Sequence, residues 1–230
     1  MDFMKKLIVA IDGPAAAGKS SVAKLLAKKL GFLYVDTGAM YRCLTLAVLE
    51  NNVDVNDEKA IAELLKKTKI RVSEDFFYVD GEDVSKKIRS NDVSKNVSIV
   101  CAYPSVRQAM VQKQREIGKG SKIGVILDGR DIGTYVFPDA DIKIYQTADT
   151  ETRALRRYQE NQIKGIECTV EEVMNDIIRR DRLDSTRLLA PLIKSNEAIL
   201  IDTSSLSISQ NVDKIYHIIL NKINEEFDDD

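Results

Sequence analysis

The chain has few cysteines and no long apolar run, and each of these absences excludes a class of protein. Cys43, Cys101 and Cys168 are odd in number, far apart and without a C-x-x-C pair. This pattern fits a reducing compartment and neither a disulfide framework nor a zinc site. No apolar run reaches the roughly 18 residues that a membrane span needs. The run Leu7–Ile11 is also too short for the core of a signal peptide. We therefore expect a cytoplasmic protein.

The chain also lacks a charge excess of either sign. Its 34 basic and 36 acidic side chains leave a net charge of −2, which argues against DNA, RNA or an anionic membrane as the main partner. A length of 230 residues suits one compact domain whose core needs no disulfide or structural metal. We expect a single domain that works as a monomer, with no nucleic-acid or membrane partner.

Strand-like and helix-like patterns alternate along the chain. The continuous apolar run Leu7–Ile11 predicts a strand buried on both faces of a parallel sheet, and apolar residues at helical spacing follow over residues 20–30. Further strands are expected at 32–35, 123–127, 142–145 and 198–201, with helices between them. This order predicts an α/β fold with a parallel central sheet covered by helices on both faces.

Residues 69–84 break the alternation. Short β-branched and aromatic stretches flank Asp80–Gly81, a hairpin turn signal. We predict a small antiparallel sheet here, inserted into the α/β pattern. We expect Phe76, Phe77 and Tyr78 to form its core.

One segment matches the pattern G-x-x-x-x-G-K-[ST] in full, immediately after the first predicted strand and at the start of the first predicted helix. Its residues are Gly13, Pro14, Ala15, Ala16, Ala17, Gly18, Lys19 and Ser20. Small residues let backbone N–H groups turn inward onto phosphate oxygens, and the helix that follows adds its unpaired amides. Lys19 can reach the β and γ phosphates, and Ser20 can ligate Mg²⁺. The segment predicts a nucleotide-phosphate loop.

The remaining sequence narrows the kind of nucleotide enzyme. A GTPase needs a guanine-reading Asn-Lys-x-Asp, whereas the nearest string, residues 221–224, lacks the Asp. A motor ATPase is usually larger and has a strand that ends in an acidic pair, but here Arg130 stands between Asp128 and Asp131. Seven arginines lie between Arg153 and Arg187, and their flat guanidinium groups suit the binding of phosphate. A small kinase fits best, since phosphoryl transfer between two anions needs many such groups.

The chain resembles the bacterial-type cytidylate kinases, which phosphorylate CMP and dCMP, over almost its whole length. The matching segments are Ile11–Ser20, Asp36–Arg42, Asp80–Val84, Ile88–Arg89, Asp128–Thr134, Val136–Ala140, Arg180–Arg187 and Ala190–Leu192. The resemblance implies a three-layer P-loop kinase fold with three parts. These are a core of about 1–37, 98–150 and 185–230, a monophosphate-binding insertion of about 38–97, and a short lid of about 151–168. It also implies ATP as co-substrate and Mg²⁺ as cofactor.

The resemblance also implies roles for individual residues. Lys19, Arg130, Arg187 and Arg157 would be catalytic, and ATP would contact the phosphate loop, Ser21, Arg153 and Arg157. The residues implied for CMP are Thr37, Tyr41, Arg42, Ser98, Arg107, Gly129, Arg130, Asp131, Arg180, Asp184 and Arg187. Within this set Ser98, Arg107 and Asp131 would read cytosine. Arg42, Arg130 and Arg187 would clamp the acceptor phosphate, and Asp184 and Arg180 would hold the ribose. A carboxylate suits cytosine because the N4 amino group of that base donates hydrogen bonds.

Several alternatives stay open from the sequence. Asp131 could be a helix cap or the ion-pair partner of Arg130. Asp12 and Asp128 could each hold a metal-bound water or serve the fold. The acceptor could be shikimate or another nucleoside monophosphate. A nucleotide-dependent switch or a nucleic-acid-associated ATPase is the rival from another functional class.

Overall fold

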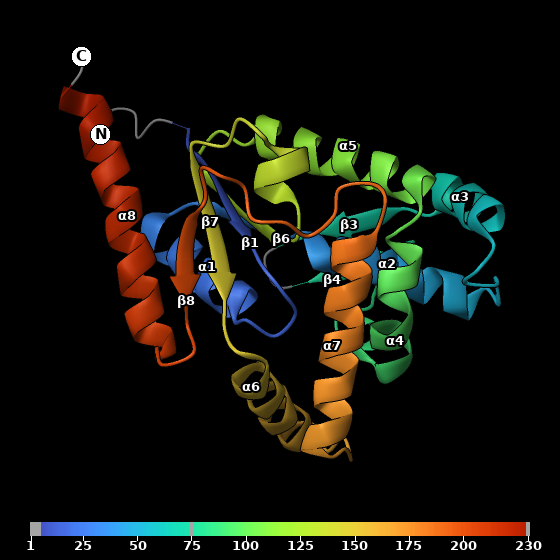
Figure 1. Cartoon of the computed structure of the whole chain (residues 1–230). Helices are drawn as coiled ribbons and strands as arrows, with labels where there is room; N and C mark the ends of the chain where they lie inside the picture. The colour runs from blue at the N-terminus through green and yellow to red at the C-terminus, as the bar shows by residue number, and fades with distance from the viewer. Residues whose placement is uncertain (1–5, 74–75, 229–230) are drawn as a thin grey trace.

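The computed structural model describes residues 6–73 and 76–228, and its centre is a five-stranded parallel sheet. The strands are β1 Ile8–Asp12, β2 Leu33–Asp36, β6 Val125–Gly129, β7 Ile142–Thr147 and β8 Ile199–Asp202. Their order is β2-β6-β1-β7-β8, and every neighbouring pair is parallel. The expected parallel sheet is therefore confirmed, with β1 in its middle (Figure 1).

Helices cover both faces of this sheet. They are α1 Lys19–Leu30, α2 Thr37–Glu50, α3 Glu58–Lys67, α4 Asn91–Val100, α5 Pro104–Gly120, α6 Thr150–Ile163, α7 Val170–Thr186 and α8 Ile208–Asp228. Because side chains of a strand alternate, β1 serves two cores. Val9 and Ile11 pack with α1 and α8, whereas Ala10 packs with α2 and α5. The apolar run of β1 is thus explained by burial on both faces.

A small antiparallel sheet lies within residues 70–83. It consists of β3 Ile70–Val72, β4 Phe77–Val79 and β5 Glu82–Asp83, and a tight turn at Asp80–Gly81 with two positive φ angles joins the last two strands. The expected sheet is confirmed, but its expected core is partly wrong. Phe77 and Val79 pack against α2, whereas Phe76 is 51% exposed. Alternation along β4 also turns Tyr78 away from that core, and its ring lies under the Arg71 guanidinium.

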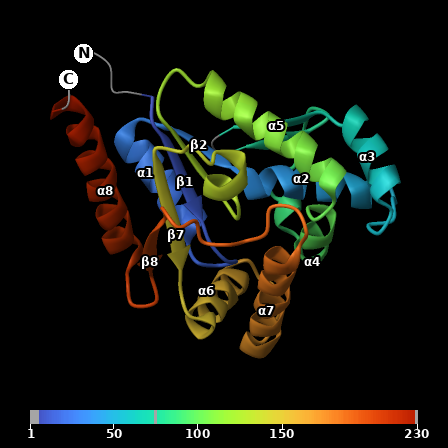
Figure 2. The ribbon, with the colours of Figure 1, turned by 45° about the horizontal axis from the view of Figure 1, so that its top comes forward.

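Helices α6 and α7 form a hairpin that projects from the carboxyl end of the sheet (Figures 1 and 2). Helix α7 begins with a capping box between Thr169 and Glu172. The hairpin has its own small apolar cluster, centred on Ala154, Val173 and Ile177. The division of the chain into core, insertion and lid stays a prediction.

Within the described parts of the chain, no helix combines the length and the apolar character that crossing a membrane requires.

Candidate active site

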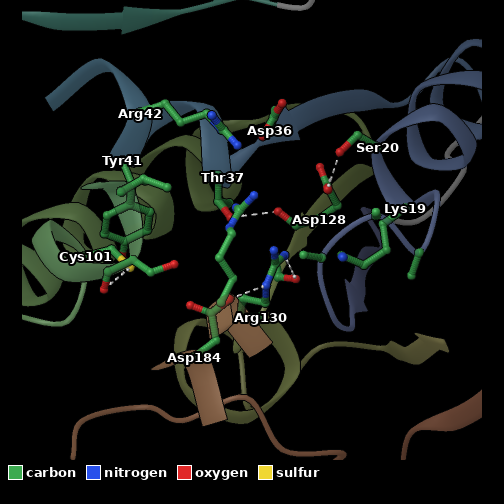
Figure 3. A pocket seen from close by; sticks show the side chains of 18 of the residues that line it. Lys19, Ser20, Asp36, Thr37, Tyr41, Arg42, Cys101, Asp128, Arg130 and Asp184 are labelled. Carbon is green, nitrogen blue, oxygen red and sulfur yellow. Dashed lines mark hydrogen bonds and ion pairs between the residues drawn. The ribbon is translucent and has the colours of Figure 1, made fainter. Parts of the chain in front are cut away.

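A cleft opens at the carboxyl ends of β1, β2 and β6, where ligands bind in open α/β sheets. The phosphate loop and helices α2, α4, α5, α6 and α7 supply its walls. Its lining residues are Ala15 to Ser21, Asp36, Thr37, Gly38, Tyr41, Arg42, Arg89, Val97, Ser98, Cys101, Arg107, Asp128 to Asp131, Arg157, Glu160, Arg180, Asp184 and Arg187. Figure 3 shows Lys19 and Ser20 at one side of this cleft and Tyr41 and Cys101 at the other, with Arg130 between them.

The phosphate loop follows β1 directly and packs against β7. A Cβ atom on Gly13 would lie 1.9 Å from the Gln146 carbonyl oxygen, so only glycine allows this approach. Gly18 has a φ of 85° at the start of α1. The Lys19 ammonium is buried and donates a hydrogen bond to the Pro14 carbonyl, 2.7 Å away. Burial and the positive charge of Arg130 lower the pKa of Lys19. An anion in the loop would relieve that repulsion.

Ser20 and Asp128 form a pair of hard oxygen donors beside the loop. The Ser20 hydroxyl donates to Asp128 Oδ2 at 2.8 Å, and the Tyr34 hydroxyl donates to Oδ1 at 2.9 Å. Burial raises the pKa of Asp128. Hydroxyl and carboxylate oxygens are the donors that Mg²⁺ takes in proteins. These residues therefore fit a Mg²⁺ ion at the first turn of α1.

Asp12 binds backbone rather than facing the cleft. Its two oxygens accept hydrogen bonds from Ile132 N at 2.8 Å and Gly133 N at 2.7 Å. These amides begin a five-residue π-helix, η2 Ile132–Val136, which the sequence pattern did not predict. Burial raises the pKa of Asp12 to about 6. The carboxylate joins the end of β1 to the segment that follows Asp131.

Asp131 lies between two arginines in the wall of the cleft. Arg107 is 1% exposed and forms an ion pair with Asp131 Oδ2, while Arg187 donates to Oδ1 at 3.2 Å. Both guanidinium groups also bind backbone, Arg107 at the Cys101 carbonyl and Arg187 at the Ala190 carbonyl. Asp131 is thus a fixed hydrogen-bond acceptor. The sequence left open that Asp131 caps a helix or pairs with Arg130. In the structure its side chain does neither.

Arg130 is paired instead with Asp184 on α7, with 2.8 Å between Nε and Oδ2. Burial alone would raise the pKa of Asp184, but the charges of Arg130, Arg187 and Arg180 hold it below its usual value. Because these arginines keep the carboxylate ionised, it can accept hydrogen bonds from a ligand hydroxyl.

Four arginines, which we call the arginine cluster, gather at the same side of the cleft: Arg42, Arg89, Arg157 and Arg180. Burial and the other three members of the cluster lower the pKa of Arg42. Within the part of the chain that the structure describes, Arg42 donates only to neutral oxygens, those of Ile88 and Ser94. Arg180 is buried, and its Nε has no hydrogen-bond partner among the described residues. Arg42 and Arg180 are buried within this cluster, and buried positive charges so close together are unfavourable until an anion enters.

Most residues that the sequence singled out line this cleft, and four do not. Gly13 and Pro14 belong to the phosphate loop but do not line the cleft, Asp12 binds backbone, and Arg153 is 6% exposed and bonded elsewhere. Sequence reasoning also missed lining residues: Asp36, Gly38, Arg89, Val97, Cys101 and Glu160. For Asp36 and Arg89 a signal existed, because both lie in segments quoted for the family resemblance. Their ion pair spans 53 residues and could not be read from either segment alone.

The comparisons with solved structures agree with the architecture. An uncharacterised protein from Eubacterium ventriosum superposes with a TM-score of 0.51 at 13% identity, covering 96% of this chain and 99% of its own. A gluconokinase from Sinorhizobium meliloti reaches 0.50 at 9% identity, covering 97% and 98%. At these identities the likeness shows the fold alone.

Sequence comparisons are more specific. The family model described as "Cytidylate kinase" matches residues 9–221. A cytidylate kinase of Bacillus velezensis is 50% identical over 222 residues, covering 95% of this chain and 98% of its own. One of Bacillus subtilis is 49% identical over the same length and the same shares. With the cleft and the phosphate loop described above, these matches establish that the chain belongs to the cytidylate kinase family.

Proposed function

We propose that the chain transfers the γ-phosphoryl group of ATP to CMP and dCMP, giving ADP with CDP or dCDP. One observation carries the proposal: a single cleft joins a phosphate loop to a buried carboxylate that two arginines hold as an acceptor. The loop suits the polyphosphate of ATP. The Asp131 carboxylate suits the amino group of cytosine, and it would face the O4 oxygen of uracil as acceptor against acceptor.

The arginine cluster is the proposed site for the acceptor phosphate. Among the described residues, no carboxylate is bonded to Arg42 or Arg180, so a phosphate dianion would give them an anionic partner. Arg130 lines the same cleft as this cluster, and Figure 3 shows it between the side of Lys19 and the side of Tyr41, so it can approach both nucleotides. The ionised Asp184 would accept hydrogen bonds from the ribose. In this arrangement Arg187, bonded to Asp131, belongs to the base end of the cleft and Arg180 to the phosphate, whereas the family resemblance implied the phosphate for Arg187 and the ribose for Arg180.

The proposed reaction needs no general base, because a CMP phosphate oxygen is already ionised at neutral pH. The chain holds the two phosphates in line, and Lys19 and Arg130 stabilise the charge that spreads over the transferred group. Ser20 would bind Mg²⁺ directly, and Asp128 would bind it through water. When bound, the metal neutralises charge on the ATP phosphates. Closure of α6 with Arg157 would exclude water from the transfer.

A coupled assay of ADP release tests the proposal. With ATP and Mg²⁺, kcat/KM should be highest for CMP or dCMP, and UMP, AMP and shikimate should react far more slowly. A better acceptor than CMP or dCMP in this set would contradict the proposed substrate. ATP hydrolysis that depends on a macromolecule and ignores CMP would favour the switch or ATPase. Action as a monomer and a cytoplasmic location remain predictions for light scattering and cell fractionation.

A further inference from the structure

The backbone of Ala15, in the middle of the phosphate loop, is held from outside the cleft. Its N–H donates to Asp181 Oδ1 at 3.0 Å, and its carbonyl accepts from Arg153 Nη1 at 3.1 Å. Asp181 and Arg153 also form an ion pair with each other. The Asp181–Arg153 ion pair thus binds both the N–H and the carbonyl of Ala15.

Neither member of this pair is placed to bind a ligand. Neither Arg153 nor Asp181 lines the cleft. The remaining contacts of Arg153 are to the Ala148 carbonyl at 3.0 Å and the Thr150 hydroxyl at 3.1 Å. All three of its nitrogens are therefore engaged, and the side chain is 6% exposed. Four of its five N–H groups are used within the protein, so this arginine chiefly holds the loop backbone and its ion-pair partner.

The loop has a physical need for such a restraint. Ala16, the next residue, has a φ of 58°, in the left-handed region that residues other than glycine avoid. Three consecutive alanines offer no polar side chain that could hold this conformation from within. Backbone of this kind persists where its surroundings fix it. The Asp181–Arg153 pair supplies two of the bonds that do so.

The pair also joins three separate parts of the chain. Arg153 lies on the first turn of α6, and Asp181 lies on α7 between Arg180 and Asp184, which face the cleft. The restraint on Ala15 therefore depends on where the α6–α7 hairpin lies. A movement of either helix away from the loop breaks a bond to Ala15.

We propose that Asp181 is a positioning residue for the donor nucleotide, acting through Arg153 and Ala15 to keep the phosphate loop in its binding shape. This rests on the proposed function only in taking ATP as the donor. Asp181→Asn keeps the size of the side chain but removes its charge, which leaves the Arg153 guanidinium buried without its counterion. The loop should then lose its fixed conformation before nucleotide binds.

Calorimetric titration with ADP, without any acceptor, tests this directly. For Asp181→Asn we expect the Kd of ADP to rise about tenfold or more, while the Kd of CMP stays within about twofold. In hydrogen exchange of the nucleotide-free protein, peptides covering residues 13–20 should exchange faster in this variant. Glu171→Gln is the matched control, because Glu171 is exposed in the first turn of the same helix. It should leave all three measurements unchanged.

A double variant separates this role from direct contact with nucleotide. If Arg153 works through the pair, Arg153→Gln should weaken ADP binding little further in the Asp181→Asn protein. A full additional loss would mean that Arg153 touches the nucleotide, and would overturn the proposal. An unchanged ADP Kd in Asp181→Asn, or equal losses for ADP and CMP with a lowered Tm, would overturn it as well. ADP binding is measured without phosphoryl transfer. The result can therefore be interpreted even if the proposed reaction with CMP is wrong.

Discussion

Arg107 and Asp131 form a buried ion pair in the wall of the cleft, with side chains 1% and 6% exposed. The second oxygen of Asp131 accepts from Arg187. Both carboxylate oxygens of Asp131 therefore serve as hydrogen-bond acceptors, each held by a guanidinium group. If CMP binds here, selection of its base depends on this one acceptor.

Replacing Asp131 should relax selection between pyrimidines. In Asp131→Asn the amide can donate to the uracil carbonyl, so the preference for CMP over UMP in kcat/KM should fall about 10- to 100-fold, the scale of one unmatched buried polar pair. Steady-state assays with both nucleotides measure this. Asp139→Asn, an exposed aspartate in the loop before β7, is the control and should keep the full preference. A variant at Asp131 that keeps it too would contradict our account of base selection.

Lys19 is the group for which we expect the largest effect on turnover. Lys19→Ala removes a buried ammonium whose pKa burial and the charge of Arg130 lower. We expect kcat to fall about 10²- to 10³-fold or more, as when one charge-stabilising donor is lost from an active site. Lys28→Ala, on the exposed side of α1, should retain normal turnover. Near-normal kcat in Lys19→Ala would be incompatible with the mechanism.

Replacing Arg180 should stabilise the free protein and weaken its binding of CMP. Burial and the charge of Arg130 lower its pKa, so the free protein is destabilised by this guanidinium. Arg180→Gln should raise the Tm of the free protein by about 2–4 °C, equivalent to roughly 1 kcal/mol. The same change should weaken CMP binding about tenfold or more, because a charge-assisted bond to the nucleotide is lost.

Differential scanning fluorimetry with and without CMP measures both effects. The exposed neighbour Arg182 gives the control, since Arg182→Gln should change neither value. A free Arg180→Gln protein that melts lower than the wild type would show that the arginine cluster is not under electrostatic strain.

The raised pKa of Asp12, about 6 against an ordinary 3.8, predicts a pH dependence of stability. The folded protein binds this proton more tightly than the unfolded chain does. Stability from the protonated form is therefore present at low pH and is lost as pH rises toward 6. Relative to Asp12→Asn, which does not titrate, the unfolding free energy of the wild type should fall by roughly 2 kcal/mol between about pH 4 and pH 7.

Urea unfolding of both proteins across this range gives that difference, and contributions from the other carboxylates cancel in it. A difference that stays flat, or that rises with pH, would contradict the burial-driven shift at Asp12.

Much of the fold follows from local signals in the sequence. The run Leu7–Ile11 and the turn at Asp80–Gly81 predict their strands correctly. Burial on two faces requires consecutive apolar residues, and a turn with positive φ favours Asp and Gly, so both features can be recognised locally in the sequence. The π-helix at Ile132–Val136 has no local sequence signal, because it is held by Asp12, more than a hundred residues earlier. The exposed position of Phe76 likewise depends on which face of β4 meets α2.

The site likewise contains parts that the sequence predicts and contacts that it could not predict. A contiguous motif such as Gly13–Ser20 carries its own geometry, so its placement could be predicted. Ion pairs could not, because a guanidinium can reach any carboxylate that the fold brings near it. Arg130 meets Asp184 rather than its neighbour Asp131, and Arg153 turns behind the loop to Asp181. Only the folded arrangement decides between such partners.

A crystal structure of the protein soaked with CMP tests the central claim most directly. We predict the cytosine amino group within hydrogen-bond distance of Asp131, and the phosphate within reach of Arg42 and Arg180, facing Lys19 across Arg130. A pyrimidine bound elsewhere, or a nucleotide phosphate that leaves these two arginines without an anion, would contradict it.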